Sequence, residues 1–529
     1  MRGLSYFVLA LSAIDAAAAA SLPFLRSLQH VGRRDPAARN LPNYDFSAIP
    51  PVEKRQTASR LNGKTKKYAV DGTKIPEVQF DIGESYAGLM PISTRKDESR
   101  ELYFWYFPSE NPAAKDEITI WLNGGPGCSS LEGLLQENGP FLWQYGTLYP
   151  VPNPWSWTKL TNMVWVEQYN PTDDNPSRPV GTGFSQGKPS VRSQEDVATQ
   201  FLGFFRNFVD TFDLHGKKIY IVGESYAGLY VPYIAHAMFE KKNKRYFNVE
   251  STMIFDPSIN KDEILTQVPA VPFVEHWKGL FPFNETFTKQ IHDMADKCGY
   301  SSYMKEHLVY PPKGKLPALP KATPECDVWT AIFDAVSLVN PCFDVYQVAT
   351  TCPLLYDVLG YPGSFEYLPA GANVYFNRTD VQKAINAPLQ KWTECSERPV
   401  FVDGKDNSEP SSFTIIPDVI EKSPRTIIAH GDLDYVLISN GTLLSIQNMT
   451  WGGAQGFSQE PSKPLFVPYH DRGSLSTLSG AGVLGRHHTE RKLTYVELYL
   501  TGHMGPQYNP SASYRILEYL LGRIDDLSK

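Results

Sequence analysis

The sequence predicts an α/β fold with a central, mostly parallel sheet, helices on both faces of that sheet and an inserted cap subdomain. The first observation behind this prediction is periodicity. Short apolar runs typical of strands alternate with longer segments whose apolar residues recur at helical spacing. The predicted strands are 118–122, 163–166, 217–222, 426–429 and 493–500, and the predicted helices are 195–208, 229–241 and 513–521.

The second observation is that this alternation stops between residues 261 and 369. That region contains four cysteines and a proline-rich run at 311–324. We interpret it as a cap inserted over the edge of the sheet where an active site would lie. The alternative is a long surface excursion without a function.

The composition is typical of a large folded enzyme. Apolar residues make up 42% of the 529 residues and charged residues 20%, so a sizeable core can form and a disordered or collagen-like chain is excluded. The net charge is −7 and no long basic run occurs, which argues against a general nucleic-acid-binding protein.

The amino-terminal region predicts export. Residues 1–20 read as a secretory signal peptide: Arg2 supplies the charge, 4–14 is mostly apolar and 16–20 consists of small residues. The apolar stretch is too short for a typical membrane span, and no later run is long enough. We therefore expect no membrane span and a secreted protein, with a vacuolar location less favoured.

Residues 21–55 are a candidate propeptide, because the stretch is polar, poorly patterned and ends in Lys54-Arg55. The alternative is a solvated tail. Cleavage after Arg55 would leave residues 56–529 as the mature domain.

The cysteines and the asparagine sequons are also consistent with the secretory route. None of the six cysteines forms C-x-x-C, so zinc-site spacing is absent, and an even count in an oxidising compartment favours three disulfides among fifteen possible pairings. Four sequons predict glycosylation, at Asn284, Asn377, Asn440 and Asn448.

The hexapeptide Gly-Glu-Ser-Tyr-Ala-Gly occurs twice, at 83–88 and at 223–228. The second copy follows a predicted strand and precedes a predicted helix, which is the setting of a nucleophile elbow centred on Ser225. The first copy follows 78–82, which we also predict as an extended strand, and no helix comes after it. Ser85 is therefore expected to be an ordinary strand serine.

A serine hydroxyl needs a base to take its proton, and the base needs an orienting acid. His503 follows the predicted strand 493–500, and Asp434 follows the predicted strand 426–429. The order Ser, Asp, His along the chain matches that of α/β hydrolases. Ala227 stands where the general elbow pattern has glycine, so the match of the bare motif is imperfect.

A third element is the glycine-rich loop 121–130, which strand 118–122 delivers at its end. Glycines let backbone amides approach a substrate oxygen closely, as an oxyanion hole requires. The natural pair of donors is the amide of Gly125 and that of Tyr226, which follows the nucleophile. The alternative is a plain Gly/Pro turn.

Together the motifs at 121–130, 223–228, 431–434 and 502–504 resemble the serine carboxypeptidases, which are α/β hydrolases of the yeast carboxypeptidase Y type. The resemblance covers roughly 78–521. The segment Phe-Asp-Pro-Ser-Ile-Asn at 255–260 looks closest to the secreted fungal carboxypeptidase S1 group. The resemblance implies an α/β-hydrolase fold, release of C-terminal amino acids from peptides and proteins through an acyl-enzyme, and no cofactor or metal.

The resemblance also implies roles for matching residues. Ser225 would be the nucleophile, His503 the base and Asp434 the orienting acid, with Asp432 a weaker candidate. Gly125 and Tyr226 would form the oxyanion hole. The residues implied to hold the substrate's C-terminal carboxylate, directly or in support, are Asn123, Glu137, Glu224 and Trp121. Cys128 is implied to pair with Cys395, and the other four cysteines to staple the cap in pairings that stay open.

Paired glutamates predict a pH dependence. Two facing carboxyls cannot both ionise cheaply, so one pKa rises and the protonated group can donate to a substrate carboxylate. His503 must be neutral to act as base. We expect peptide turnover to peak near about pH 4–6, with ester or amidase activity persisting at higher pH.

One departure from the family pattern concerns residues 169–178. The family reads Val-Glu-Gln directly into Pro-Val-Gly-Thr-Gly-Phe-Ser, whereas here ten polar residues separate 166–168 from 179–185. The stretch is either a surface loop or a gene-model artefact.

Two other functions are compatible with the same residues: an acyltransferase or lyase on a carboxypeptidase-like scaffold, and a binding protein without activity. A metallopeptidase is disfavoured because no H-E-x-x-H occurs. The preferred C-terminal residue, basic or bulky apolar, and the oligomeric state stay open.

Overall fold

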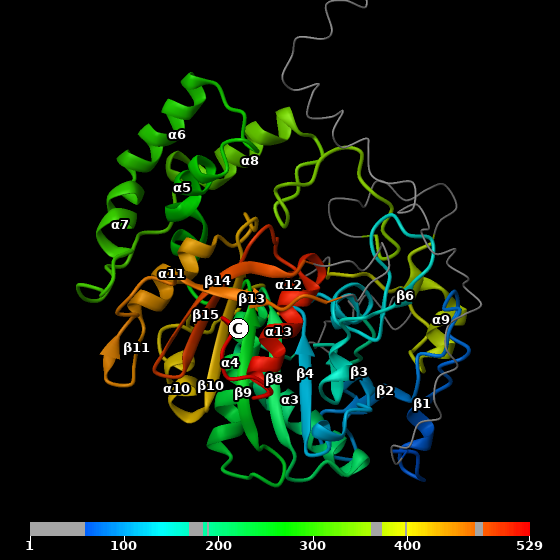
Figure 1. Ribbon diagram of the computed structural model, residues 1–529. Helices are drawn as coiled ribbons and strands as arrows, with labels where there is room; N and C mark the ends of the chain where they lie inside the picture. Colours follow the sequence, from blue (N-terminus) through cyan, green and yellow to red (C-terminus); the bar gives the residue numbers. More distant parts are fainter. Residues whose placement is uncertain (1–58, 169–182, 188–189, 361–372, 397–398, 471–479) are drawn as a thin grey trace, which may run out of the picture. The chain divides into compact units, whose positions relative to one another are not determined.

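The computed structural model describes residues 59–168, 183–187, 190–360, 373–396, 399–470 and 480–529 (Figure 1). The expected signal peptide, propeptide and insertion at 169–178 lie outside the described residues. So does the carboxyl-terminal end of the expected cap.

The described chain is built on one eleven-stranded sheet with the order β1-β2-β3-β7-β4-β8-β9-β10-β15-β14-β13. Its central strands are parallel: β7 (Met163–Val166), β4 (Glu117–Leu122), β8 (Lys218–Glu224), β9 (Val249–Phe255), β10 (Arg425–Gly431) and β15 (Leu493–Leu498). Antiparallel strands extend both edges: β1 (Ala69–Val70), β2 (Ser85–Pro91), β3 (Glu101–Phe107), β14 (Gly482–Glu490) and β13 (Lys463–Val467). The predicted mostly parallel centre is confirmed.

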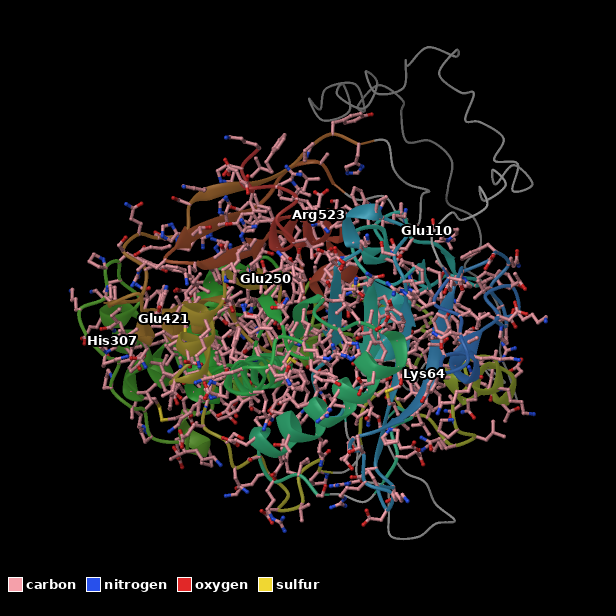
Figure 2. The ribbon with its side chains drawn as sticks, turned by 90° about the horizontal axis from the view of Figure 1, so that it is seen from below. Lys64, Glu110, Glu250, His307, Glu421 and Arg523 are labelled. Carbon is pink, nitrogen blue, oxygen red and sulfur yellow. A yellow bond between two sulfur atoms is a disulfide. The ribbon has the colours of Figure 1, made fainter. Side chains whose placement is uncertain are left out.

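Helices cover both faces of the sheet because its central strands are apolar on both sides. On one face, Ile118, Ile120 and Leu122 of β4 pack in a core with the apolar residues of α3 (Gln194–Phe212) and α4 (Ala227–Glu240). On the other face, Trp121 belongs to a core that includes residues of α13 (Pro510–Leu520). Other charged side chains lie at the surface, among them Lys64, Glu110 and Glu421, which are exposed (Figure 2).

Most predicted elements are found within a few residues of their expected ends. The prediction of an extended strand at 78–82 is wrong. Those residues form an irregular loop, where the Asp81 side chain accepts a hydrogen bond from the Gly83 amide at 2.8 Å and the Ile82 amide donates to the Gly72 carbonyl at 3.2 Å. These local bonds compete with a strand ladder. Strand β2 begins at Ser85 instead, as expected for an ordinary strand serine.

Where it is described, the region expected to be a cap consists of several helices together with irregular stretches at 308–323 and 340–360. It contains η7 (Glu263–Gln267), α5 (Val268–His276), α6 (Glu285–Lys297), α7 (Tyr300–His307), η8 (Pro324–Cys326) and α8 (Val328–Val339). Disulfides Cys298–Cys326 and Cys342–Cys352 cross-link it. Its apolar residues share a core with Leu433 and Tyr435, which follow β10.

Shorter elements complete the described chain: η3 (Lys66–Tyr68), η4 (Pro112–Ala114), α2 (Ser130–Glu132), η5 (Gly133–Glu137), β5 (Phe141–Leu142), β6 (Val151–Pro152), η6 (Trp157–Lys159), η10 (Tyr375–Asn377), α9 (Thr379–Ala384), α10 (Ile415–Lys422), α11 (Ser439–Asn448), β11 (Thr450–Trp451), β12 (Ala454–Gln455) and α12 (Gly505–Tyr508). Among the described helices, none combines the length and hydropathy needed to cross a bilayer.

Candidate active site

Ser225 lies in the sharp turn between β8, which ends at Glu224, and α4, which begins at Ala227. Its φ of 59° is left-handed, which is rare for a residue with a side chain and typical of a nucleophile elbow. Its amide donates to the Phe255 carbonyl at 2.9 Å, and its carbonyl accepts from the Gly228 amide at 2.9 Å. The end of β9 and the first turn of α4 therefore hold the strained residue in place.

Small residues allow the elbow to pack against its neighbours. A Cβ added at Gly223 would lie 2.6 Å from the Ala227 Cβ, so glycine at 223 leaves room for alanine at 227. A Cβ at Gly124 would lie 2.5 Å from the Tyr226 amide nitrogen and 2.6 Å from the Ser225 Cβ. The loop after β4 can therefore approach the elbow only because residue 124 is glycine.

The two expected oxyanion-hole donors lie where the loop after β4 packs against the elbow, one in each segment. Gly125 has a left-handed φ of 112°, and Tyr226 forms the amino-terminal cap of α4. Neither backbone amide donates a hydrogen bond to another described residue. Both amides are therefore available to a ligand as far as the described chain is concerned.

His503 is oriented by Asp434. The His503 Nδ1 lies 2.7 Å from the Asp434 Oδ2, and its backbone amide donates to the Tyr346 carbonyl at 2.7 Å. The Asp434 Oδ1 accepts bonds from the amides of Val436 and Leu437 at 2.9 and 3.1 Å. The His503 Nε2 has no hydrogen-bond partner among the described residues. The ring therefore presents Nε2 with its other nitrogen fixed.

Burial lowers the pKa of His503 to about 3, although the nearby Asp344 opposes this shift. The imidazole is thus neutral over most of the acid pH range. A neutral imidazole is the form that can accept a proton from a serine.

Asp432, the weaker candidate for the orienting acid, is placed differently. It accepts a hydrogen bond from the Thr501 amide at 3.3 Å and lines a separate cavity of about 730 Å³. Of the two aspartates in the motif, only Asp434 contacts His503.

A cavity of about 270 Å³ lies beside Ser225 and His503. The other lining residues come from the glycine-rich loop, the start of α2, the end of β8, the region expected to be a cap and the segments around 395 and 504: Asn123, Gly124, Gly125, Pro126, Cys128, Glu132, Glu224, Tyr346, Glu394, Cys395, Ser396 and Met504. None of these described lining residues is a lysine or an arginine. Among its described residues, the cavity wall therefore carries acidic groups without a cationic side chain.

Trp121, Asn123 and Glu224 form a chain of hydrogen bonds at this wall. The Trp121 Nε1 donates to the Asn123 Oδ1 at 2.7 Å, and the Asn123 Nδ2 donates to the Glu224 Oε1 at 2.8 Å. Asn123 also donates to Glu132. Glu137 is buried, and carboxylate oxygens of Glu132, Glu137 and Glu224 lie within 4.8 Å of one another. Glu137 and Trp121 do not line the cavity themselves; they lie next to residues that do.

Burial raises the pKa of these carboxyl groups. It raises that of Glu132 to about 8 and those of Glu137 and Glu224 well above the usual range, and the neighbouring acids raise all three further. The cluster therefore retains protons at acid and neutral pH.

Sequence reasoning missed two acids of this wall, Glu132 and Glu394. Both Glu394 oxygens and the Glu132 Oε1 have no hydrogen-bond partner among the described residues. A signal existed for each residue. Glu132 follows the glycine-rich loop directly, and Glu394 precedes Cys395, which the resemblance already linked to that loop.

The Cys128–Cys395 disulfide implied by the resemblance is present. It joins the glycine-rich loop to a segment 267 residues away in sequence. In addition, the Ser129 amide donates to the Glu394 carbonyl at 2.7 Å. The disulfide and this bond fix Glu394 against the loop that carries Gly125.

Hydrogen bonds connect the described residues on the two sides of the insertion at 169–178. The Glu167 carboxylate accepts a hydrogen bond from the Ser129 hydroxyl at 2.5 Å and one from the Phe184 amide at 3.1 Å. The Ser185 hydroxyl donates to the Glu167 carbonyl at 3.0 Å. Glu167 therefore links both flanks to the glycine-rich loop.

The four sequon asparagines differ in their surroundings. Asn284 is exposed at the start of α6, whereas Asn377, Asn440 and Asn448 are half-buried. The Asn377 side chain donates to the Trp392 carbonyl at 2.8 Å and accepts from its amide at 2.6 Å.

Comparison with known proteins decides the family, because the model of the family described as serine carboxypeptidase matches residues 76–523. The chain belongs to the serine carboxypeptidase family. A carboxypeptidase Y homolog of Arthroderma benhamiae is 49% identical over 470 residues, 89% of each chain. The serine-type carboxypeptidase F of Aspergillus niger is 44% identical over 495 residues, 90% of each chain.

A solved structure supports the fold. The prohormone-processing carboxypeptidase Kex1(delta)p of Saccharomyces cerevisiae superposes with a TM-score of 0.67 at 23% identity, covering 89% of this chain and 99% of that one. The protein is a serine-type carboxypeptidase, a hydrolase with the α/β-hydrolase fold. In this serine carboxypeptidase the expected residues Ser225, His503, Asn123, Gly125 and Glu224 all line one cavity.

Proposed function

We propose that this serine carboxypeptidase releases C-terminal amino acids through a triad of Ser225, His503 and Asp434. One observation carries the proposal: His503 is bonded to Asp434 through Nδ1, while its Nε2 has no partner among the described residues and the ring lines the same cavity as the elbow serine. This is the arrangement that an imidazole needs to accept a serine proton.

The proposed reaction proceeds through an acyl-enzyme. The Ser225 Oγ attacks the last peptide carbonyl while His503 takes its proton, and the amides of Gly125 and Tyr226 stabilise the negative oxygen. His503 then gives the proton to the departing amino acid. A water molecule, deprotonated by the same imidazole, attacks the acyl-enzyme; the imidazolium then returns the proton to the Ser225 oxygen as the bond to the acyl group breaks and the shortened peptide leaves.

The restriction to chain ends is assigned to Asn123, Glu137 and Glu224, with Trp121 in support. In this proposal the Asn123 amide and a protonated glutamate donate hydrogen bonds to the substrate's terminal carboxylate. A substrate without that carboxylate loses these bonds. Peptides and proteins with free C-termini are therefore the proposed substrates.

The proposed activity is highest at acid pH. Burial lowers the pKa of His503, so the neutral form that can take the serine proton persists into the acid range. The glutamates bind a carboxylate while they hold protons, and they repel it once pH rises through their raised pKa values and they ionise. Binding of peptides should therefore weaken as pH rises.

We further propose that residues 1–20 are a signal peptide, that 21–55 is a propeptide removed to give the mature enzyme 56–529, and that 261–369 forms a cap. Secretion, with a vacuolar location less favoured, fits the even cysteine count and the sequons Asn284, Asn377, Asn440 and Asn448. Determining the amino terminus and the glycopeptides of the protein from culture medium tests these assignments.

The decisive experiment measures amino-acid release from a blocked dipeptide at about pH 4.5, near the optimum expected for a neutral base and protonated glutamates. Ser225→Ala and Ser85→Ala are matched variants, because both serines lie in the same hexapeptide. We expect Ser225→Ala to abolish release and Ser85→Ala to keep it, and an amidated dipeptide to be a poor substrate. Release that survives in Ser225→Ala would refute the triad. Labelling of Ser225 by a serine-directed inhibitor without any release would indicate acyl transfer instead.

A further inference from the structure

Asp256 is a buried acid beside the proposed triad that the mechanism above does not use. It is the first residue after β9, its exposed fraction is 0%, and its φ is 43°. Its amide donates to the Ala429 carbonyl of β10 at 2.8 Å, and the Phe255 carbonyl next to it accepts from the Ser225 amide. A strained backbone conformation of this kind persists where surrounding contacts fix it, and residues with such strain are common at functional sites.

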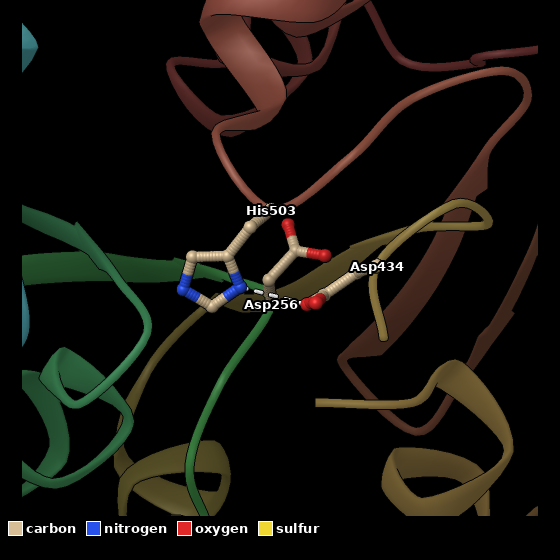
Figure 3. A group of neighbouring side chains, drawn as sticks. All are labelled: Asp256, Asp434 and His503. Carbon is tan, nitrogen blue, oxygen red and sulfur yellow. Dashed lines mark hydrogen bonds and ion pairs between the residues drawn. The ribbon is translucent and has the colours of Figure 1, made fainter. Parts of the chain in front are cut away.

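The Asp256 side chain points toward Asp434 and His503 (Figure 3). Carboxylate oxygens of Asp256 and Asp434 and a ring nitrogen of His503 all lie within 4.8 Å of one another. The Asp256 Oδ1 accepts one hydrogen bond, from the Gly431 amide at 2.7 Å, and its Oδ2 has no partner in the described chain. Asp434, in contrast, accepts three N–H bonds.

No charged cation balances this pair among the described residues. His430 Nε2 lies 3.5 Å from Asp256 and 3.6 Å from Asp434, but the same nitrogen lies 2.7 Å from the Leu437 carbonyl, to which it donates. Burial lowers the pKa of His430 to about 3, so this imidazole is neutral. Besides His503, the other titratable groups that face the pair are acids or tyrosines: Asp344, Asp432, Glu224, Tyr346 and Tyr495.

Two adjacent buried carboxyls without a cation hold one proton between them. Hydrogen bonds from N–H groups favour the ionised form of a carboxyl. Asp434 has three such bonds and Asp256 has one, so the proton belongs on Asp256. The Asp256 Oδ2 is the oxygen without a partner in the described chain. A proton on this oxygen can be donated to the other acid of the pair, Asp434.

We propose that Asp256 is a positioning residue of the triad, a protonated acid that donates a hydrogen bond from its side chain to the Asp434 carboxylate. This inference rests on the proposed triad. The bond holds Asp434 in the orientation that the His503 Nδ1 requires. It also disperses part of the Asp434 charge, so that His503 is less readily protonated and remains a neutral base in acid.

The test compares Asp256→Asn, whose amide can still donate, with Asp256→Ala, which cannot. The readout is the acid limb of kcat/KM for an amidated or ester substrate, which avoids the glutamate cluster. Asp256→Ala should lower kcat about 10-fold or more, the effect of losing a hydrogen bond to a charged group. With an undispersed Asp434 charge, His503 should become more basic, and the acid limb should move up by about half a unit to one unit. Asp256→Asn should keep the wild-type limb.

A matched control is Asp432→Asn, two residues from Asp434 and without contact to His503. Burial raises the pKa of Asp432 to about 7, so this acid is largely uncharged in the acid range and its replacement should leave the limb unmoved. A merely structural role would lower the yield of folded enzyme or kcat in both Asp256 variants without moving the limb of the alanine variant. An unmoved limb in Asp256→Ala, or a limb moved equally in both variants, would overturn the proposal.

Infrared difference spectra keep the proposal testable if Asp256→Ala fails to fold. Wild type minus Asp256→Asn at neutral pH should contain the carbonyl stretch of a protonated carboxylic acid. A carboxylate band in its place would overturn the proposal. Failure of the triad itself is recognised separately, because Ser225→Ala would then retain activity.

Discussion

Two clusters of buried carboxyl groups flank Ser225, and they differ in the hydrogen-bond partners of their carboxylate oxygens. The Asp256–Asp434 pair is closed off and receives hydrogen bonds from backbone amides and from His503. The glutamate cluster borders a cavity, and oxygens of Glu132, Glu137, Glu224 and Glu394 lack partners in the described chain. Backbone donors fix the orientation of an acid, whereas unpaired oxygens beside a cavity are free to exchange partners with a ligand. The closed pair is therefore suited to orient the base, and the open cluster to recognise a substrate.

The largest expected effect comes from breaking the closed cluster. Asp434→Asn removes the acceptor for the His503 Nδ1 proton and favours the wrong tautomer. We expect kcat to fall by about 10⁴-fold, as when the acid of a serine triad is lost. The fall should be equal for peptide and amidated substrates, because this cluster does not touch the terminal carboxylate. A much larger loss for the peptide would contradict the division between the clusters.

The open cluster should give a substrate-dependent effect. Glu137→Ala removes a candidate donor to the substrate carboxylate, so kcat/KM for a peptide should fall about 10–100-fold, the cost of one hydrogen bond to a charged group. Turnover of the matching amidated substrate should stay within a factor of a few. Parallel kinetics on the two substrates at acid pH check this, and equal losses would show that Glu137 acts through the fold.

A smaller effect is expected on pH dependence. The charge of Glu132 raises the pKa values of both Glu137 and Glu224. Glu132→Gln removes that charge, so the pair ionises at lower pH. The rise of KM for a peptide should therefore begin at a lower pH than in the wild type. Profiles of KM against pH measure the shift, and a shift to higher pH would contradict the sign of the coupling.

The smallest effect is expected at Asp432. This acid lines a different cavity and does not contact His503. Asp432→Asn should leave kcat/KM within about twofold of wild type, as for substitutions outside the reacting groups. A loss comparable to that of Asp434→Asn would reverse the assignment of the orienting acid.

Much of the arrangement follows from local sequence signals. Strands 118–122, 217–222, 426–429 and 493–500 could be predicted because buried parallel strands are continuous apolar runs, and each of them ends near a site residue. In the sequence prediction, the copy around Ser225 differs from the copy around Ser85 only by the helix that follows it; in the structure the two also differ in what comes before, because a strand precedes Ser225 and an irregular loop precedes Ser85. The disulfide Cys128–Cys395 came from the family resemblance.

Other features depend on contacts that periodicity does not encode. The strand predicted at 78–82 failed because the Asp81 side chain and the Gly72 carbonyl take up the backbone amides locally. Glu394 lies 271 residues from Asn123 in sequence, and a disulfide brings it to the cavity. The pairing of Asp256 with Asp434 arises because β9 and β10 are neighbours in the sheet, which the strand pattern alone leaves unspecified.

The hydrogen bonds of Glu167 have a consequence for protein engineering. One carboxylate receives Ser129 from the glycine-rich loop and Phe184 from beyond the departure at 169–178, so the chain leaves and returns within the reach of a single side chain. Such a junction is a suitable place to shorten the chain or to graft a foreign peptide, because the bonds of Glu167 to Ser129 and Phe184 hold the two described flanks together. Residues 169–178 are therefore the first place to insert an affinity tag or a reporter in this enzyme.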